Sequence, residues 1–316
     1  MRAVLKQLLD EGWQYDPCYL PSYNSDHLPM TLSAMAGLGA SDEVLTAFQA
    51  SYSQRLRPVE PGPKIAQLQD GRGHREAFAS MRLLLQASIA DQGMATVVRE
   101  YLPRLLPSLA AEAFHPLIRL GFALNNQHEM EVASALAYWM TSPFSPQLKT
   151  PIQATHMTEV LCADRSVGIV SGSFGEGLNA LVERNIYPAP VSTTLADCAS
   201  ASLNVYLGTR NFFALHLVTA TEAARACRAY VSEAELVAAL SAALRAAYLV
   251  LDAPNFNQVL AIPSRIDEEH APKYVYACSS EYQAWGDPRY LEEINGFKAA
   301  GLVPDWVNAS RDRFEE

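Results

Sequence analysis

The apolar positions of this 316-residue chain recur mostly at the spacing of amphipathic helices. Near the start, Val4, Leu5, Leu8 and Leu9 share one helical face, and Gly12 is a natural stop. The same spacing predicts helices over residues 30–38, 41–56, 74–92, 94–113, 114–125, 129–140, 193–206, 212–230 and 233–251, and it resumes after residue 152.

Proline and capping residues refine several of these helices. Pro29 fits the first turn of the helix over 30–38, which puts His27 at or just before its N-terminus. Ser41 is a good N-cap for the next helix. Pro103 and Pro107 must kink or divide the helix over 94–113.

The pattern predicts an all-α fold. Runs of alternating apolar and polar residues with hairpin turns do not recur, and neither does the strand and helix alternation of a parallel sheet. We expect one large helical domain over residues 1–316, with any metal site between helices. The proline-bounded break at 143–151 is the one candidate for a division into two closely packed helical halves.

A glycine-rich stretch, Gly168 to Gly177, is predicted to be a flexible loop. It lacks the Gly-Lys-Ser/Thr ending of a phosphate-binding loop. Ser171 stands where the nucleophile elbow of a hydrolase needs its first glycine. Neither nucleotide binding nor serine hydrolysis is therefore favoured.

Composition narrows the class of partner. With 49% hydrophobic residues the chain can bury a large core. The formal net charge is −10 and no Lys/Arg cluster is visible, so we expect neither nucleic acid nor an anionic membrane surface as a partner. The apolar run 236–251 contains Arg245 and is short for a membrane span.

The cysteines and the N-terminus predict a cytoplasmic protein. The five cysteines are scattered, odd in number and never spaced as Cys-x-x-Cys, which favours free thiols in a reducing compartment. Asp10 and Glu11 interrupt the first apolar run before it reaches the length of a signal peptide.

The seven histidines are the most informative candidates for a functional site, and three of them have ordinary surroundings. His74 and His128 lie at the start of predicted helices and look like capping or surface residues. His156 has no acidic or histidine neighbour at helical spacing. We interpret these three as structural.

The other four histidines, His27, His115, His216 and His270, lie in or beside apolar helical segments. One histidine on an apolar face is usually a satisfied core residue. Four of them on four different helices favour a shared role, and a metal site is the natural one.

The stretch from Asp267 to Tyr274 crowds three acids, an imidazole and an amine together. Residues three apart share a helical face, so His270 could act with Asp267 or with Lys273. Asp267-x-x-His270 and Glu112-x-x-His115 also match the spacing in carboxylate-bridged di-iron proteins. That alternative needs two further carboxylates, for which Glu176 and Glu222 are candidates with no distinguishing feature.

Taken in order, four segments resemble the questin oxidase-like family, and together they span nearly the whole chain. The segments are Asp26-His27-Leu-Pro-Met30 with Leu38-Gly-Ala; Phe114-His115-Pro-Leu-Ile-Arg119 with Ala135-Leu-Ala-Tyr-Trp139; Leu215-His216-Leu-Val-Thr219; and His270-x-x-Lys273. The family resembles helical oxygenases that open rings of anthraquinones and related aromatic polyketides.

The resemblance implies a mononuclear non-haem iron, Fe(II), that reacts with O₂. Its implied ligands are His27, His115, His216, His270 and a carboxylated Lys273. The chain departs from the family pattern in three places, Asp26 for Asn, Pro116 for a small residue, and Pro272 between His270 and Lys273. Pro272 matters most, since a proline within a helix would tilt Lys273 while one in the first turn is harmless.

The residue types suit this chemistry. Neutral imidazoles bind Fe(II), and a carbamate adds a hard anionic oxygen. We expect oxidative C–C cleavage of a small aromatic or polyketide-type substrate, either Baeyer–Villiger-like or by a dioxygenase route. Arg119 and Thr219 lie about one turn from ligands and are candidates to orient substrate or ligands, although Arg119 could instead pair with Glu112.

Several questions stay open at the level of sequence. Trp13, Tyr23, Phe114 and Trp139 could line a flat apolar pocket, yet core packing suits each of them. The substrate, the need for NADPH and the oligomeric state are not defined. A di-iron oxidase, a hydrolase that uses Zn or Mn, and a helical binding protein with packed core histidines are the alternatives.

Overall fold

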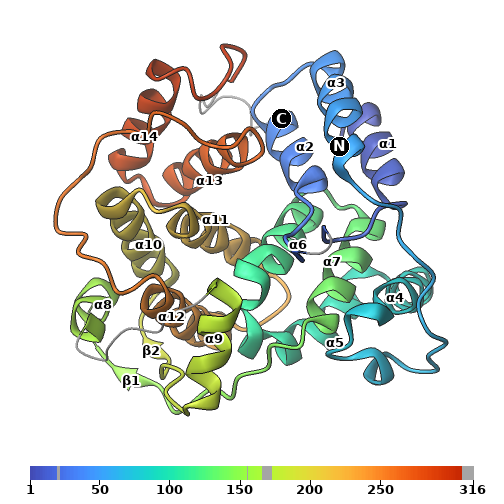
Figure 1. The fold of residues 1–316 in the computed structure, drawn as a ribbon, viewed down its shortest axis with the longest axis horizontal. Helices are drawn as coiled ribbons and strands as arrows, with labels where there is room; N and C mark the ends of the chain where they lie inside the picture. The colour runs from blue at the N-terminus through green and yellow to red at the C-terminus, as the bar shows by residue number, and fades with distance from the viewer. Residues whose placement is uncertain (20–21, 155, 166–172, 308–316) are drawn as a thin grey trace. The chain divides into compact units, whose positions relative to one another are not determined.

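The computed structural model describes residues 1–19, 22–154, 156–165 and 173–307, and α-helices dominate it (Figure 1). This confirms the predicted all-α class. The helices fall into two compact units, a terminal unit of Met1–Pro58 with Leu260–Glu316 and a middle unit of Val59–Val259. The break at 143–151 lies inside the middle unit. The unit boundaries along the sequence follow Pro58 and Val259 and are not at the expected position.

The terminal unit joins the two ends of the chain. Helices α1 to α3 and the pair α13 and α14 take opposite ends of the colour range in Figure 1. Helix α2 packs against α1, α3 and α13, and α13 packs against α14. The elements are α1 (Ala3–Gly12), α2 (Leu28–Gly37), α3 (Asp42–Tyr52), η1 (Ser53–Arg55), α13 (His270–Trp285) and α14 (Pro288–Ala299).

Helix α2 is the most buried element of the terminal unit, because its residues from Leu28 to Met35 are all covered. Pro29 lies in its first turn, as predicted. The Asp26 carboxylate accepts a hydrogen bond from the Leu28 N–H at 2.8 Å and so satisfies a donor at the helix start. Ser41 caps α3 through the Val44 N–H, which confirms the second predicted helix start.

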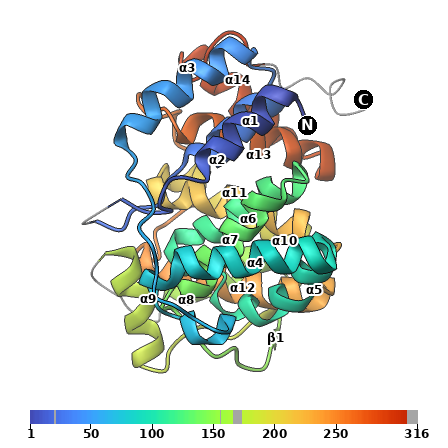
Figure 2. The same ribbon diagram turned by 90° about the vertical axis from the view of Figure 1, so that its right-hand side faces the viewer.

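The middle unit is a succession of packed helices. Helix α4 lies on α7, α7 on α6, α6 on α11 and α11 on α10, and Figure 2 shows α4, α7 and α6 side by side. The α-helices are α4 (Phe78–Gln92), α5 (Met94–Leu105), α6 (His115–Asn125), α7 (Glu129–Thr141), α8 (Met157–Asp164), α9 (Phe174–Glu183), α10 (Leu195–Thr209), α11 (Phe212–Cys227) and α12 (Glu233–Val250). Short 3-10 helices are η2 (Leu68–Gly71), η3 (Arg75–Ala77), η4 (Leu106–Ser108) and η5 (Ala111–Phe114).

The predicted helix over 94–113 is divided as its prolines require. Helix α5 tolerates Pro103 in its last turn, and Pro107 falls in the separate element η4. Part of the predicted glycine loop is corrected, because α9 begins at Phe174. Ser173 and Glu176 form a capping box there, a helix signal that the glycines obscured. Residues 166–172 of that stretch, including Ser171, lie outside the described residues.

The helical pattern expected directly after residue 152 is also corrected. Ile152 and Gln153 form strand β1 (Ile152–Gln153), which pairs in parallel with β2 (Val191–Ser192). Helix α8 begins only at Met157. A strand of two residues is too short to show an alternating pattern, so periodicity could not reveal it.

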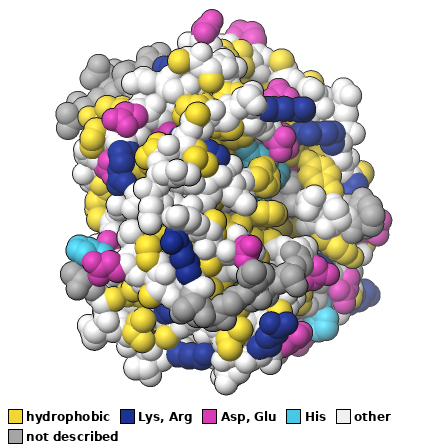
Figure 3. All heavy atoms as spheres, turned by 60° about the vertical axis from the view of Figure 1, so that its left-hand side comes forward, with side chains coloured by type: hydrophobic (Ala, Val, Ile, Leu, Met, Phe, Trp, Pro, Cys, Tyr) yellow, Lys and Arg dark blue, Asp and Glu magenta, His cyan; other side chains and the backbone are white. Residues whose placement is uncertain are grey.

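The cysteines and the charged surface residues agree with the predictions made from the sequence. All five cysteines are free thiols. Lys and Arg side chains are scattered among acidic and apolar ones on the face in Figure 3. Within the described residues, every helix is too short or too polar to cross a membrane.

Gly121 permits the close approach of α6 and α11, and this gives a first prediction. A Cβ at position 121 would lie 2.7 Å from both Cα and Cβ of Ala223. We expect Gly121→Ala to destabilise the protein by about 1–3 kcal/mol through overpacking, measured by urea unfolding. Gly175→Ala in α9 is the matched control, because a Cβ there meets nothing within 4 Å. Equal stability of the two variants would contradict the close packing.

Candidate functional site

His27 lies at the N-cap of α2 and is held through its backbone. Its N–H donates to the Tyr52 hydroxyl at 3.1 Å, and the same oxygen accepts from the Tyr19 hydroxyl at 2.6 Å. Burial raises the pKa of Tyr19 to about 12, and that of Tyr52 is raised further by the same cause. Both phenols therefore stay protonated and serve as fixed hydrogen-bonding groups.

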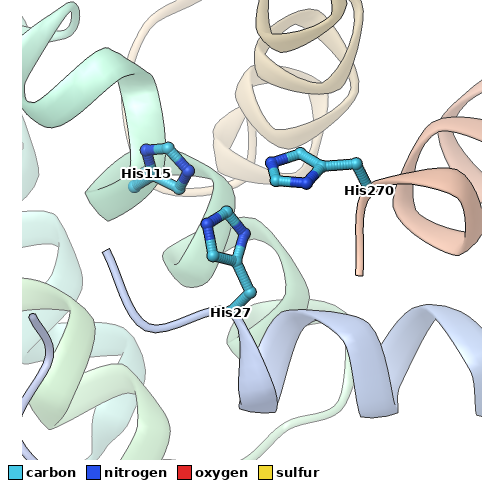
Figure 4. Close-up of side chains that lie close together, drawn as sticks. All are labelled: His27, His115 and His270. Carbon is cyan, nitrogen blue, oxygen red and sulfur yellow. The ribbon is translucent and has the colours of Figure 1, made fainter. Parts of the chain in front are cut away.

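His270 is the first residue of α13, and its ring meets that of His27 within the terminal unit. The two ring centroids are 4.5 Å apart at an interplanar angle of 60°. Figure 4 shows His27 and His270 pointing toward one another from the starts of α2 and α13. The backbone N–H of His270 donates to the Asp267 carbonyl at 2.9 Å, which makes Asp267 a helix-start residue.

Lys273 joins this pair. Its side chain is 1% exposed, and its Nζ lies in hydrogen-bond contact with Nδ1 of His27. Burial lowers the pKa of Lys273 to about 7, against the opposing effects of Glu269 and Asp26. Pro272 falls in the first turn of α13, where its missing N–H costs nothing, so it does not move Lys273 away.

The middle unit holds the second histidine pair. His115 on α6, also drawn in Figure 4, and His216 on α11 have ring centroids 4.7 Å apart at 58°. Both are buried, His216 at 1% exposure. The sequence predicted these side chains as partners in one site, and the close packing of α6 and α11 brings these two together.

Backbone carbonyls define which nitrogen of each ring in the middle unit carries the proton. Nδ1 of His115 lies 2.5 Å from the Glu112 carbonyl, and Nδ1 of His216 lies 3.2 Å from the Phe212 carbonyl. A carbonyl oxygen only accepts, so in each ring Nδ1–H is the donor. The lone pair of each ring is then on Nε2, which is the arrangement found in metal-ligating histidines.

A left-handed turn precedes His115. Glu112, Ala113 and Phe114 have φ values of 50°, 53° and 68°, and none of the three is glycine. Left-handed backbone costs about 1–2 kcal/mol for each residue with a Cβ. Such a turn marks a place where surrounding contacts fix the backbone against its own preference.

Arg119 and Thr219, the two candidates for orienting substrate or ligands, are both engaged in the core. Arg119 forms a buried bidentate ion pair with Glu131, at 2.8 and 3.0 Å. The suggested pairing of Arg119 with Glu112 is therefore wrong. The Thr219 hydroxyl donates to the His216 carbonyl at 3.3 Å, which places it one turn from that ligand candidate, as expected.

Three of the four carboxylates of the di-iron alternative contact residues other than the candidate histidines, and the fourth, that of Asp267, is largely exposed. Glu112 accepts from Arg75 and from Ser142, and Asp267 is 57% exposed with its Oδ2 3.9 Å from Nδ1 of His270. Glu176 is exposed in its capping box, and Glu222 contacts Asn125 at 3.4 Å. These contacts do not favour a carboxylate-bridged centre.

The three histidines interpreted as structural are placed accordingly. His128 caps α7 by accepting from the Glu131 N–H at 3.1 Å. His74 is exposed beside Glu76 at 3.5 Å. His156 is exposed and lies 3.6 Å from Asp197, a partner too distant in sequence for helical spacing to reveal.

Aromatic side chains near His216 were missed by sequence reasoning. Phe213 stacks on Phe174 at 5.1 Å, and Phe212 meets His216 edge-on at 5.3 Å. The available signal was the Phe-Phe pair in the helical turn before the candidate ligand His216. Among the residues named as pocket candidates, Trp139 is a core residue whose Nε1 donates to Ser108, and Phe114 is fully buried.

The fold and these side chains define a class, an all-α protein in which each unit buries a pair of imidazoles. Comparison with known proteins then adds a family likeness over part of the chain. Residues 24–166 match the Questin oxidase-like family, so the resemblance noted in the sequence is confirmed over that part of the chain.

A curated protein adds a distant likeness. Oxidoreductase AflY of Aspergillus parasiticus is 28% identical over 187 residues, which cover 54% of this chain and 38% of AflY. The matched region thus spans well under half of that relative. Both comparisons name oxidative enzymes.

The Arg119–Glu131 pair gives the second prediction. Both side chains are nearly fully buried, so Glu131→Gln would leave a guanidinium without its counter-charge. We expect a loss of about 3–5 kcal/mol in unfolding free energy, measured by urea denaturation. Glu100→Gln, in an exposed pair with Arg104, is the matched control with a change below about 0.5 kcal/mol. Similar effects of the two substitutions would show that the buried pair is unimportant.

Proposed function

We propose that this chain is a non-haem iron-dependent oxygenase that cleaves a C–C bond of a small aromatic or polyketide-type substrate. The observation that supports it most is the pair of buried imidazoles in each unit, each with a ring-to-ring distance below 5 Å. The oxidative class is supported by the Questin oxidase-like match and by the name of the curated relative.

The residues fit the proposed metal. Nε2 of His115 and of His216 carry lone pairs, because both Nδ1 atoms donate to carbonyls. Neutral imidazoles suit Fe(II). In the terminal unit His27 and His270 face each other with Lys273 in contact. That the two pairs serve one ion comes from the family resemblance and is part of the proposal.

Each group then has a defined task. When bound, iron would activate O₂ for oxygen insertion beside or onto a ring carbon. The Glu112 and Phe212 carbonyls keep the rings of His115 and His216 in the ligating tautomer. Tyr52 anchors the backbone of His27. Burial of all four rings excludes water from their surroundings, which strengthens the electrostatic interactions there.

Metal content gives the third prediction. Protein purified without chelator is expected to contain about one iron per chain by elemental analysis. His27→Ala, His115→Ala, His216→Ala and His270→Ala should each remove most of it, because each deletes a ligand. The exposed His156→Ala is the matched control and should keep it.

Two results would overturn this assignment. No metal in the folded wild type would favour a helical binding protein with packed core histidines. About two irons per chain, lost in Glu112→Ala and kept in Lys273→Ala, would favour the di-iron alternative.

Lys273 gives the fourth prediction. Addition of CO₂ to its neutral amine forms an N–C bond and releases one proton, and the product is an anionic carbamate. We expect a carbamate ¹³C resonance when the protein is equilibrated with ¹³C-bicarbonate, and its loss in Lys273→Met, which keeps the apolar stem. The exposed Lys6→Met is the control. A resonance that survives in Lys273→Met would assign the carbamate elsewhere, and none in wild type would refute it.

A further inference from the structure

The contacts around the left-handed turn before His115 indicate the function of that turn. We propose that Glu112 is a positioning residue for the metal centre. Through Arg75 and Ser142 its carboxylate holds the left-handed turn of residues 112–114, and its carbonyl then fixes the tautomer and orientation of His115. This inference rests on the proposed function, in which His115 is a ligand.

The position of His115 in its helix explains why a special turn is needed. His216 lies four residues after Phe212, so a carbonyl of its own helix reaches its Nδ1. His115 is instead the first residue of α6, and no earlier turn of that helix exists. The left-handed turn brings the Glu112 carbonyl to 2.5 Å from Nδ1 and supplies the missing acceptor.

The amino-acid sequence of the turn works against its backbone. Glycine adopts positive φ without a Cβ clash, yet this segment contains Glu, Ala and Phe. A conformation of this kind persists only where neighbouring structure over-determines it, and such segments cluster at functional sites. The contacts that hold it should therefore be identifiable.

Those contacts are made by the Glu112 side chain and by burial of the two residues that follow. Glu112 Oε1 accepts from Arg75 Nη2 at 2.6 Å and from Ser142 Oγ at 2.8 Å. These partners come from η3 and from the end of α7, 37 and 30 residues away along the chain. Phe114 is fully buried and Ala113 is 8% exposed, which anchors the far side of the turn.

The consequence for ligation is geometric. With Nδ1–H donated to the Glu112 carbonyl, the His115 lone pair is on Nε2 and the ring plane is fixed. If the carboxylate contacts are lost, the turn can relax toward ordinary backbone. The carbonyl then leaves Nδ1, and the ring can adopt the other tautomer.

Imidazole ¹⁵N NMR of the metal-free protein tests this directly. The His115 signals are assigned by their loss in His115→Gln. We expect the Nδ1–H tautomer in wild type and a mixture of tautomers in Glu112→Ala. Co(II) titration should show about 10–100-fold weaker binding in that variant. Glu112→Gln keeps the acceptor oxygen for Ser142 and should restore much of the wild-type tautomer.

Two controls separate positioning from general destabilisation. Leu85→Ala leaves a cavity in the core of the same unit and should lower stability without changing the His115 tautomer. Ala113→Gly should keep the tautomer and raise the melting temperature, because glycine accepts positive φ. If Glu112→Ala fails to fold, Arg75→Met and Ser142→Ala each remove one contact and should shift the tautomer partially.

The outcomes are distinct from those of the proposed function. A His115 tautomer unchanged in Glu112→Ala, or lost equally in Leu85→Ala, would overturn the positioning role. A wild type that binds no metal but shows the Glu112-dependent tautomer would refute the metal centre and still leave Glu112 as the residue that positions His115.

Discussion

Burying an imidazole in an apolar helical core requires a partner for its ring N–H, and the structure is organised by that constraint. In the middle unit, backbone carbonyls of Glu112 and Phe212 take this part. In the terminal unit, Nδ1 of His27 contacts the buried amine of Lys273. In each case the contact uses one ring nitrogen, Nδ1, and this determines that Nε2 is the nitrogen that could contact a metal or substrate.

Three of the four rings occupy helix starts. His27 is the N-cap of α2, and His115 and His270 are the first residues of α6 and α13. The partial positive charge at a helix N-terminus disfavours a second positive charge nearby. Prolines at or near these starts, Pro29 and Pro116 among them, leave the required hydrogen bonds unaffected.

The sequence was informative where local rules apply and silent where distant contacts decide. Helical spacing located α1 to α7. The sequence left open whether Pro272 displaces Lys273, because the answer depends on where α13 begins, and α13 begins at His270. The turn at 112–114 contains no glycine, so the sequence gives no signal of a left-handed backbone there. Contacts with Arg75 and Ser142, which are distant in sequence, hold that backbone. The partner of Arg119 was predicted wrongly because Glu131 is on another helix, and helical periodicity relates only residues of the same helix.

The family match and the geometry support different halves of the candidate site. Residues 24–166 contain His27 and His115. His216, His270 and Lys273 lie outside that range, and they are connected to the matched residues by contacts within each unit. His216 meets His115 across α6 and α11, and His270 and Lys273 meet His27 across α2 and α13. Each unit therefore contains one matched histidine, and contacts within that unit add its unmatched partners. That the two pairs belong to one site is part of the proposal.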